Sequence, residues 1–144
     1  MGEELIRVKR LRPNARLPER ATDGSTGYDL YACLDEPIEV GLAPIKVPAG
    51  IAIEAPQRFD VQIRPRSGLS SKGVIVAFGT IDSDYRGELL VTMYALPSGA
   101  THVVHDGDRI AQMVVTRAEH PSLELVEELT TTARDTGGHG STGR

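Results

Sequence analysis

The chain has 144 residues, a length that suits one domain with a buried core. Its formal net charge of -4 argues against a broad basic surface for nucleic acid, and its single cysteine, Cys33, excludes an internal disulfide. Because the sequence shows neither a signal-peptide pattern nor an apolar run of membrane-spanning length, we expect a cytoplasmic protein without a membrane partner.

Short apolar runs separated by glycine and proline follow one another along the chain, and several alternate with period two. One helical turn is expected at 67–72, and strands are expected at 5–11, 28–33, 51–54, 59–64, 74–78, 89–94, 101–104 and 109–115. The segment 123–129 is either a strand or a short helix, and its alternation favours a strand. This pattern predicts an all-β sandwich, jelly roll or barrel. The polar, Gly-rich end has no apolar pattern, so we expect a domain at 1–129 and a mobile tail at 130–144.

The stretch 79–88 joins two strand-like runs and holds two carboxylates, a phenol and a guanidinium. It is either a solvated turn or the wall of a pocket. In a pocket, Asp82 would accept a proton, Tyr85 would offer a flat face, and Gly79 would let a ligand approach the backbone. The spacing also matches half of a calcium loop, but Met93 stands at the twelfth position, where a glutamate is required.

Three other segments contain polar groups that suit anion binding or a structural role. Arg66 and Ser67 lie where a strand gives way to a helical turn, which indicates either an anion site or a helix N-cap. Gln112 follows the turn at 106–108 and offers a neutral amide that can bond a phosphate oxygen. Asp29 lies just inside a strand, where a structural carboxylate is the simpler interpretation.

The tail contains Gly-x-Gly-x-x-Gly at 138–143, the spacing of a dinucleotide fingerprint. The fingerprint requires a strand before it and a helix after it, and neither is predicted here. A flexible arm with bare amides can fold over a polyphosphate, although a Gly-rich terminus can also be simply disordered. The four histidines show no metal-ligand spacing.

Taken together and in order, five segments resemble the five motifs of the trimeric dUTP pyrophosphatase (dUTPase) family: 27–30, 64–69, 79–87, 107–112 and 134–143. The resemblance implies an all-β fold, a distorted β-barrel of jelly-roll type. It further implies a homotrimer whose active sites are shared between subunits, with a flexible Gly-rich C-terminal arm that closes over a neighbour's site. The implied reaction is Mg2+-assisted hydrolysis of dUTP to dUMP and pyrophosphate by in-line attack of water on the α-phosphorus. Such a reaction limits uracil incorporation into DNA and supplies dUMP for dTMP synthesis.

The resemblance also implies roles for individual residues. Asp82 would be the general base, and Tyr85 would pack under the deoxyribose and exclude UTP. The backbone around Gly79 and Leu90 would mimic a base-pairing edge for uracil. Asp29 would lie near the water shell of Mg2+, which the substrate phosphates would mainly hold.

The remaining implied contacts with dUTP come from the strand-to-helix turn, a neutral amide and the arm. Contacts with the phosphates are implied for Arg66, Ser67, Gly68 and Gln112. Closure on the γ-phosphate is implied for Arg134, Ser141 and Thr142. The implied substrate-binding set is completed by Thr80, Ile81, Gly140 and His139, whose ring would stack on the base.

Two positions depart from the family pattern. His139 stands where the family often has Phe, and its imidazole adds a titratable group to a stacking position. Val76 stands where some members have an Asn that contacts uracil, so base recognition would depend on backbone groups.

Other functions fit the same fold class. A dCTP deaminase is the nearest, but Asp82-x-x-Tyr85 and the complete arm motif favour hydrolysis. A non-catalytic nucleotide-binding regulator is a second possibility, opposed by the intact set of catalytic residue types. A purely structural jelly roll, as in capsids, would need none of these polar clusters.

Overall fold

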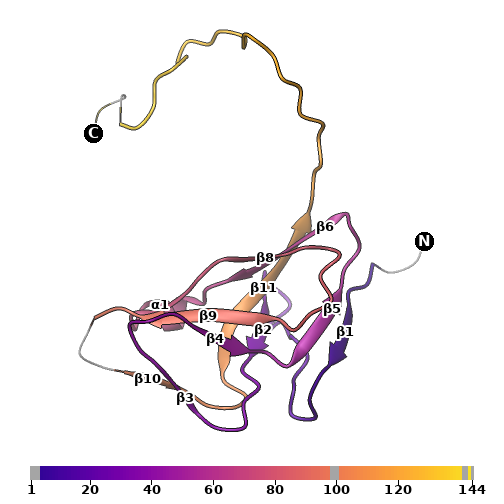
Figure 1. Cartoon of the computed structure of the whole chain (residues 1–144), viewed down its shortest axis with the longest axis vertical. Helices are drawn as coiled ribbons and strands as arrows, with labels where there is room; N and C mark the ends of the chain where they lie inside the picture. The colour runs from indigo at the N-terminus through magenta and orange to yellow at the C-terminus, as the bar shows by residue number, and fades with distance from the viewer. Residues whose placement is uncertain (1–3, 98–100, 141–142, 144) are drawn as a thin grey trace.

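The computed structural model describes residues 4–97, 101–140 and 143 (Figure 1). These residues form a β protein with a single turn of helix, which confirms the expected all-β class. The elements are β1 (Arg7–Arg10), β2 (Tyr28–Tyr31), β3 (Ile38–Val40), β4 (Ile45–Pro48), β5 (Ile51–Glu54), β6 (Phe59–Arg64), α1 (Ser67–Ser70), β7 (Val74–Val76), β8 (Gly79–Ile81), β9 (Leu90–Ala95), β10 (His102–Val104) and β11 (Arg109–Arg117). In the described residues, no helix is long and apolar enough to cross a membrane.

The strands pair into four small antiparallel sheets. The largest has the order β2-β11-β6-β8, the next has the order β4-β9-β7, and two further sheets pair β1 with β5 and β10 with β3. Strands far apart in the sequence therefore lie side by side, as in a jelly roll. The described residues form open sheets rather than one closed barrel.

The core between these sheets is aliphatic. Alternation along β6 and β9 sends every second side chain inward, and the largest fully buried side chains include Leu30, Ile51, Leu89, Met93 and Ile110. Burying an aliphatic side chain of this size contributes about 1.5–3 kcal/mol relative to leaving it in water. The strands that carry the polar loops are therefore fixed by burial of their inner faces.

The C-terminal segment behaves differently from the rest of the chain. After β11 ends at Arg117, the chain leaves the packed body and runs outward in a wide arc (Figure 1). The strand expected at 123–129 is wrong for the isolated chain: these residues form no strand in the described structure, and Leu123, Leu125 and Leu129 are 95%, 100% and 85% exposed. A strand needs a neighbour for its hydrogen bonds, and this segment has left every sheet of its own chain.

Candidate active site

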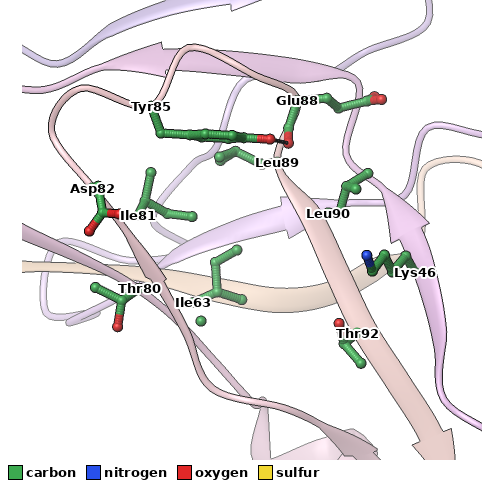
Figure 2. A pocket seen from close by; sticks show the side chains of 11 residues that line it. Lys46, Ile63, Thr80, Ile81, Asp82, Tyr85, Glu88, Leu89, Leu90 and Thr92 are labelled. Atoms are coloured by element: carbon green, nitrogen blue, oxygen red, sulfur yellow. Dashed lines mark hydrogen bonds between the residues drawn. The ribbon is translucent and has the colours of Figure 1, made fainter.

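A cavity of about 270 Å³ opens between β8, β9 and the loop that connects them (Figure 2). Its lining consists of Lys46, Ile63, Gly79, Thr80, Ile81, Asp82, Tyr85, Glu88, Leu89, Leu90 and Thr92. This set includes most of the residues that the sequence singled out around 79–90. The volume is near the lower end for small-molecule sites, which suits the base and sugar of one nucleotide.

Two strand edges face this cavity with free backbone groups. Among the described strands, β8 is the last in its sheet and pairs only with β6, so its other edge has no neighbour. On β9, Leu90 lies opposite Pro48 of β4 and beyond the end of the pairing with β7, which stops at Met93. Backbone N–H and C=O groups on such edges are free to bond a ligand.

The loop from β8 to β9 presents Asp82 and Tyr85. The Tyr85 amide donates to the Asp82 carbonyl at 3.0 Å, and the Tyr85 hydroxyl donates to the Glu88 carbonyl at 2.9 Å. Gly87 permits this fold because a Cβ at Gly87 would collide with the Tyr85 ring and hydroxyl. The flat ring thus lies along one side of the cavity, with Asp82 at the end of β8 (Figure 2).

Asp82 lines a second cavity as well as the first. The second is lined by Gln57, Phe59, Asp60, Thr80, Ile81, Asp82, Ser83, Asp84, Ala118 and His120. Within the described part of the chain, the Asp82 carboxylate makes no ion pair or side-chain hydrogen bond. A free, accessible carboxylate can hold a water molecule by accepting one of its protons.

A separate polar cluster forms at the opposite edge of the largest sheet. Asp29 on β2 is only 14% exposed and lies 3.2 Å from Arg66 Nε and 3.8 Å from Arg109 Nη1. Gln112 on β11 lies opposite Asp29 in register and donates to the Pro65 carbonyl at 2.9 Å. The structure therefore brings Asp29, Arg66 and Gln112 together, although they come from three separate segments of the sequence.

Gly27 and the helix α1 complete this cluster. A Cβ at Gly27, just before β2, would occupy the space of the Gln112 amide, so the glycine lets Gln112 keep this position. The N-cap of α1 is Arg66 rather than Ser67, and Arg66 makes no side-chain cap bond. The N-cap interpretation of Ser67 is therefore wrong, since Ser67 is the first helical residue. Gly68 is unobstructed, because no atom outside its chain neighbours and the backbone of its own helix lies within 4 Å of the position that a Cβ would take there.

Within one chain, the cavity that contains Asp82 and Tyr85 lies apart from the cluster of Asp29, Arg66 and Gln112. β8 and β2 form the two edges of the four-stranded sheet, with β6 and β11 between them. Three strand spacings put these edges about 14 Å apart. The cavity that contains Asp82 and Tyr85 does not include Arg66, Ser67, Gly68 or Gln112.

The arm residues are also away from the cavity. Arg134 donates to the Gly137 carbonyl at 2.6 Å, which makes a local turn, and His139 and Gly140 have left-handed φ values of 51° and 86°. None of these residues lines the cavity, and Ser141 and Thr142 lie outside the described residues.

Sequence reasoning missed several residues of the cavity. Lys46 reaches it because β4 pairs with β9 so that Lys46 lies opposite Thr92. Glu88 was visible in the central stretch, but nothing in the sequence showed that its carboxylate accepts from Arg12 at 2.7 Å and from the Gly50 amide at 2.9 Å. The hydrogen bond to Glu88 is the main reason that the pKa of Arg12 is raised.

Comparison with known proteins points to a single family. The family model for dUTPase matches residues 13–143. The chain is 48% identical over 140 residues to the deoxyuridine 5'-triphosphate nucleotidohydrolase of Chlamydia trachomatis serovar D, covering 93% of this chain and 95% of that protein. It is 44% identical over 147 residues to the protein of the same name from Leptospira interrogans serovar Lai, covering 96% of this chain and 98% of that protein.

Solved structures agree in fold. The dUTPase of Staphylococcus bacteriophage 80alpha with dUPNHPP superposes with a TM-score of 0.83 at 26% identity, covering 97% of this chain and 99% of that chain. A mutant dUTPase from phage phi11 of S. aureus, described with a structural Mg(II) ion, has a TM-score of 0.78 at 26% identity and covers 86% of this chain and 97% of that chain. The chain belongs to the dUTPase family.

Proposed function

We propose that this protein is a dUTP diphosphatase, which hydrolyses dUTP to dUMP and pyrophosphate. One observation carries the proposal: a free carboxylate, a flat phenol ring, the unpaired edge of β8 and the end of β9 beyond its pairing with β7 line the same cavity in a member of the dUTPase family. The relatives compared above carry the name of the nucleotidohydrolase, which favours hydrolysis over deamination of dCTP.

The Asp82 carboxylate acts as the general base. It accepts a proton from a water molecule, whose oxygen forms a bond to the α-phosphorus while the bond from the α-phosphorus to the bridging oxygen breaks. Pyrophosphate leaves in line with the attacking water. Because the carboxylate is unpaired in the described residues, its contribution is to orient this water, and positioning of this kind accounts for much of the rate of such reactions.

The cavity selects the nucleoside. The backbone of Gly79 on the free edge of β8 and of Leu90 on β9 offers donors and acceptors for the edge of uracil, with Thr80 and Ile81 beside them. The Tyr85 ring packs against the deoxyribose and leaves no room for a 2′-hydroxyl. No side chain is required at Val76 for this recognition.

The residues that are present fit Mg2+ only if the substrate phosphates carry the ion. The described residues include no group of three His, Cys, Asp or Glu side chains placed to hold a metal. Asp29 is half of an ion pair with Arg66, so its role toward the ion is through a water molecule. Bound to the triphosphate, Mg2+ would supply positive charge to offset the negative charge of the leaving pyrophosphate.

A homotrimer with shared sites accounts for the two separated groups. Asp82 and Asp29 lie toward opposite edges of one sheet, so a triphosphate in the Asp82 cavity would meet the Arg66, Ser67, Gly68 and Gln112 cluster of another chain. As far as residue 140, the C-terminal arm, 130–144, lies away from its own body. We propose that the arm closes on a neighbour's site, with Arg134, Ser141 and Thr142 at the γ-phosphate and Gly140 and His139 at the base. A cytoplasmic location completes this proposal.

The test is pyrophosphate release from dUTP, dCTP, dTTP and UTP with Mg2+. We expect rapid release from dUTP alone, and a loss of about 10²–10⁴-fold in kcat for Asp82→Asn, which keeps the shape of the side chain but removes the base. Asp84→Asn is the matched control, because Asp84 belongs to the same loop but lines only the second cavity.

Three results would contradict the proposal. Binding of dUTP without hydrolysis would favour a nucleotide-binding regulator. Release of ammonia from dCTP would favour a deaminase. Equal loss of activity in Asp82→Asn and Asp84→Asn would remove Asp82 from its role as the base.

A further inference from the structure

We propose that Glu88 is a positioning residue for recognition of the sugar. The Glu88 carboxylate fixes the loop between β8 and β9. The main-chain carbonyl of Glu88 then holds the Tyr85 hydroxyl in one position beside the cavity. The inference rests on the proposed function, which it deepens by naming the group that makes Tyr85 a rigid barrier to ribose.

The carboxylate of Glu88 is tied to two segments that are distant in the sequence. Oε2 accepts from Arg12 Nη2 at 2.7 Å and from the Gly50 amide at 2.9 Å. The Arg12 and Glu88 side chains are only 32% and 28% exposed, so solvent screens this ion pair less than an exposed one. A carboxylate that accepts from both a guanidinium and a backbone amide forms strong, directional bonds.

The backbone at the same point is fixed as well. The Leu89 amide donates to the Ile51 carbonyl at 2.9 Å, and the Ala49 amide donates to the Leu89 carbonyl at 3.0 Å. Leu89 is fully buried. Glu88 is therefore the last residue of the loop before this fixed backbone, and the residues before it extend over the cavity.

Tyr85 takes its position from this fixed end. Its hydroxyl donates to the Glu88 carbonyl at 2.9 Å, and this is the only hydrogen bond of the Tyr85 side chain among the described residues. Figure 2 shows the ring reaching across to this carbonyl, while the Glu88 carboxylate points the other way. Glu88 thus acts on the substrate through Tyr85.

Rigidity of the ring is what discriminates against a 2′-hydroxyl. A mobile ring can move to admit the additional oxygen, whereas a ring fixed at both ends cannot do so without breaking a hydrogen bond. Removing the Glu88 carboxylate is therefore expected to raise kcat/KM for UTP relative to kcat/KM for dUTP, rather than to lower both equally.

The test compares kcat/KM for dUTP and for UTP in Glu88→Ala, Glu88→Gln and Arg12→Met. We expect the dUTP to UTP ratio to fall by about tenfold or more in Glu88→Ala, the size of effect of one lost charge-assisted hydrogen bond. Glu88→Gln keeps an oxygen that can accept from the Gly50 amide, so its ratio should lie between those of Glu88→Ala and the parent. Arg12→Met removes only the guanidinium partner, so its ratio should also fall between these two.

Asp106→Asn is the matched control. Asp106 is also a carboxylate that accepts from a backbone amide and a side chain, from Leu34 at 2.9 Å and from Asn14 at 3.1 Å, but it lies outside the Tyr85 loop. We expect Asp106→Asn to change the free energy of unfolding while leaving the dUTP to UTP ratio unchanged.

A second measurement uses the ligand-free protein. The NMR signal of Tyr85 in protein with 13C-labelled tyrosine, assigned by its loss in Tyr85→Phe, should shift or broaden in Glu88→Ala and remain in place in Asp106→Asn. An unchanged Tyr85 signal, or an unchanged ratio in both Glu88 variants, overturns the proposal. A parent protein that hydrolyses no dUTP overturns the proposed function instead, and the Tyr85 signal then still decides whether Glu88 positions the ring.

Discussion

Gly50 is the residue at which backbone conformation and packing are most tightly coupled. Its φ of +71° is left-handed, and a Cβ there would lie 2.5 Å from Cys33 Sγ and 2.7 Å from Cys33 Cβ. Cys33 is itself completely buried, and burial raises the pKa of its thiol. Gly50 therefore has a left-handed backbone and no room for a methyl group beside Cys33.

We expect Gly50→Ala to lower the free energy of unfolding by about 2–5 kcal/mol, because the left-handed strain and the overpacking add. Gly107→Ala is the control: Gly107 has a similar φ of +81° but nothing within 4 Å of its Cβ position, so only the strain of about 1–2 kcal/mol applies. Urea denaturation of both variants measures the difference. Equal losses would show that packing against Cys33 contributes nothing.

Among the elements, the segment 123–129 forms no strand with the described residues of its own chain. Its three leucines at 123, 125 and 129 are almost fully exposed. Apolar side chains at this exposure are typical of a surface that binds a partner. Since the proposed assembly is a homotrimer, the partner that fits is a second copy of the chain.

Replacing Leu123, Leu125 and Leu129 by serine is expected to shift the protein from trimer toward monomer, measured by light scattering over a dilution series. The body of the chain buries none of these side chains, so its thermal unfolding as a monomer should change little. Leu42→Ser is the control, because Leu42 is 67% exposed but lies on the packed body. A triple variant that remains trimeric would remove the segment from the interface.

The contrast between elements shows what the sequence can and cannot predict. Alternation located β6, which buries one face in its own chain, and apolar runs located β9 and β11, which bury most of their apolar side chains in the same core. The same alternation at 123–129 predicted a strand that the isolated chain does not form, since a periodic pattern identifies a face to be buried but not the surface that buries it.

The residues of the candidate site also fall into those that the sequence could place and those that it could not. Asp82 and Tyr85 were predictable because they lie in one contiguous motif, whose turn and flanking strands are local. Lys46 and the Glu88 carboxylate were not, because their placement depends on β4, Arg12 and Gly50, which are distant in the sequence. Contacts of this kind are set by the register of strands rather than by spacing.

At the scale of the whole molecule, the proposed trimer takes Asp82 and the arm of each site from different chains. Chains with Asp82→Asn and chains shortened after residue 129 should therefore each be nearly inactive alone. When the two are co-expressed, random assembly should restore about a quarter of the sites, because half of the Asp82 positions and half of the arms are intact.

The measurement is pyrophosphate release from dUTP by the mixed protein, with native mass spectrometry to show that mixed trimers are present. Two separately purified samples combined without exchange of subunits provide the control. Mixed trimers without recovered activity would mean that each chain supplies both Asp82 and the arm to one site.

The free edge of β8 has a consequence for solubility. An unpaired strand edge can be extended by any other strand with exposed backbone groups, and such edges promote aggregation. Here the edge must stay open if it is to pair with a base, so it cannot be blocked by proline or covered by a loop. Its protection is instead its length of three residues and the negative charges of Asp82 and Asp84 beside it. Nucleotide bound along this edge would cover it. The enzyme should therefore aggregate most slowly in storage when its product or an analogue is present.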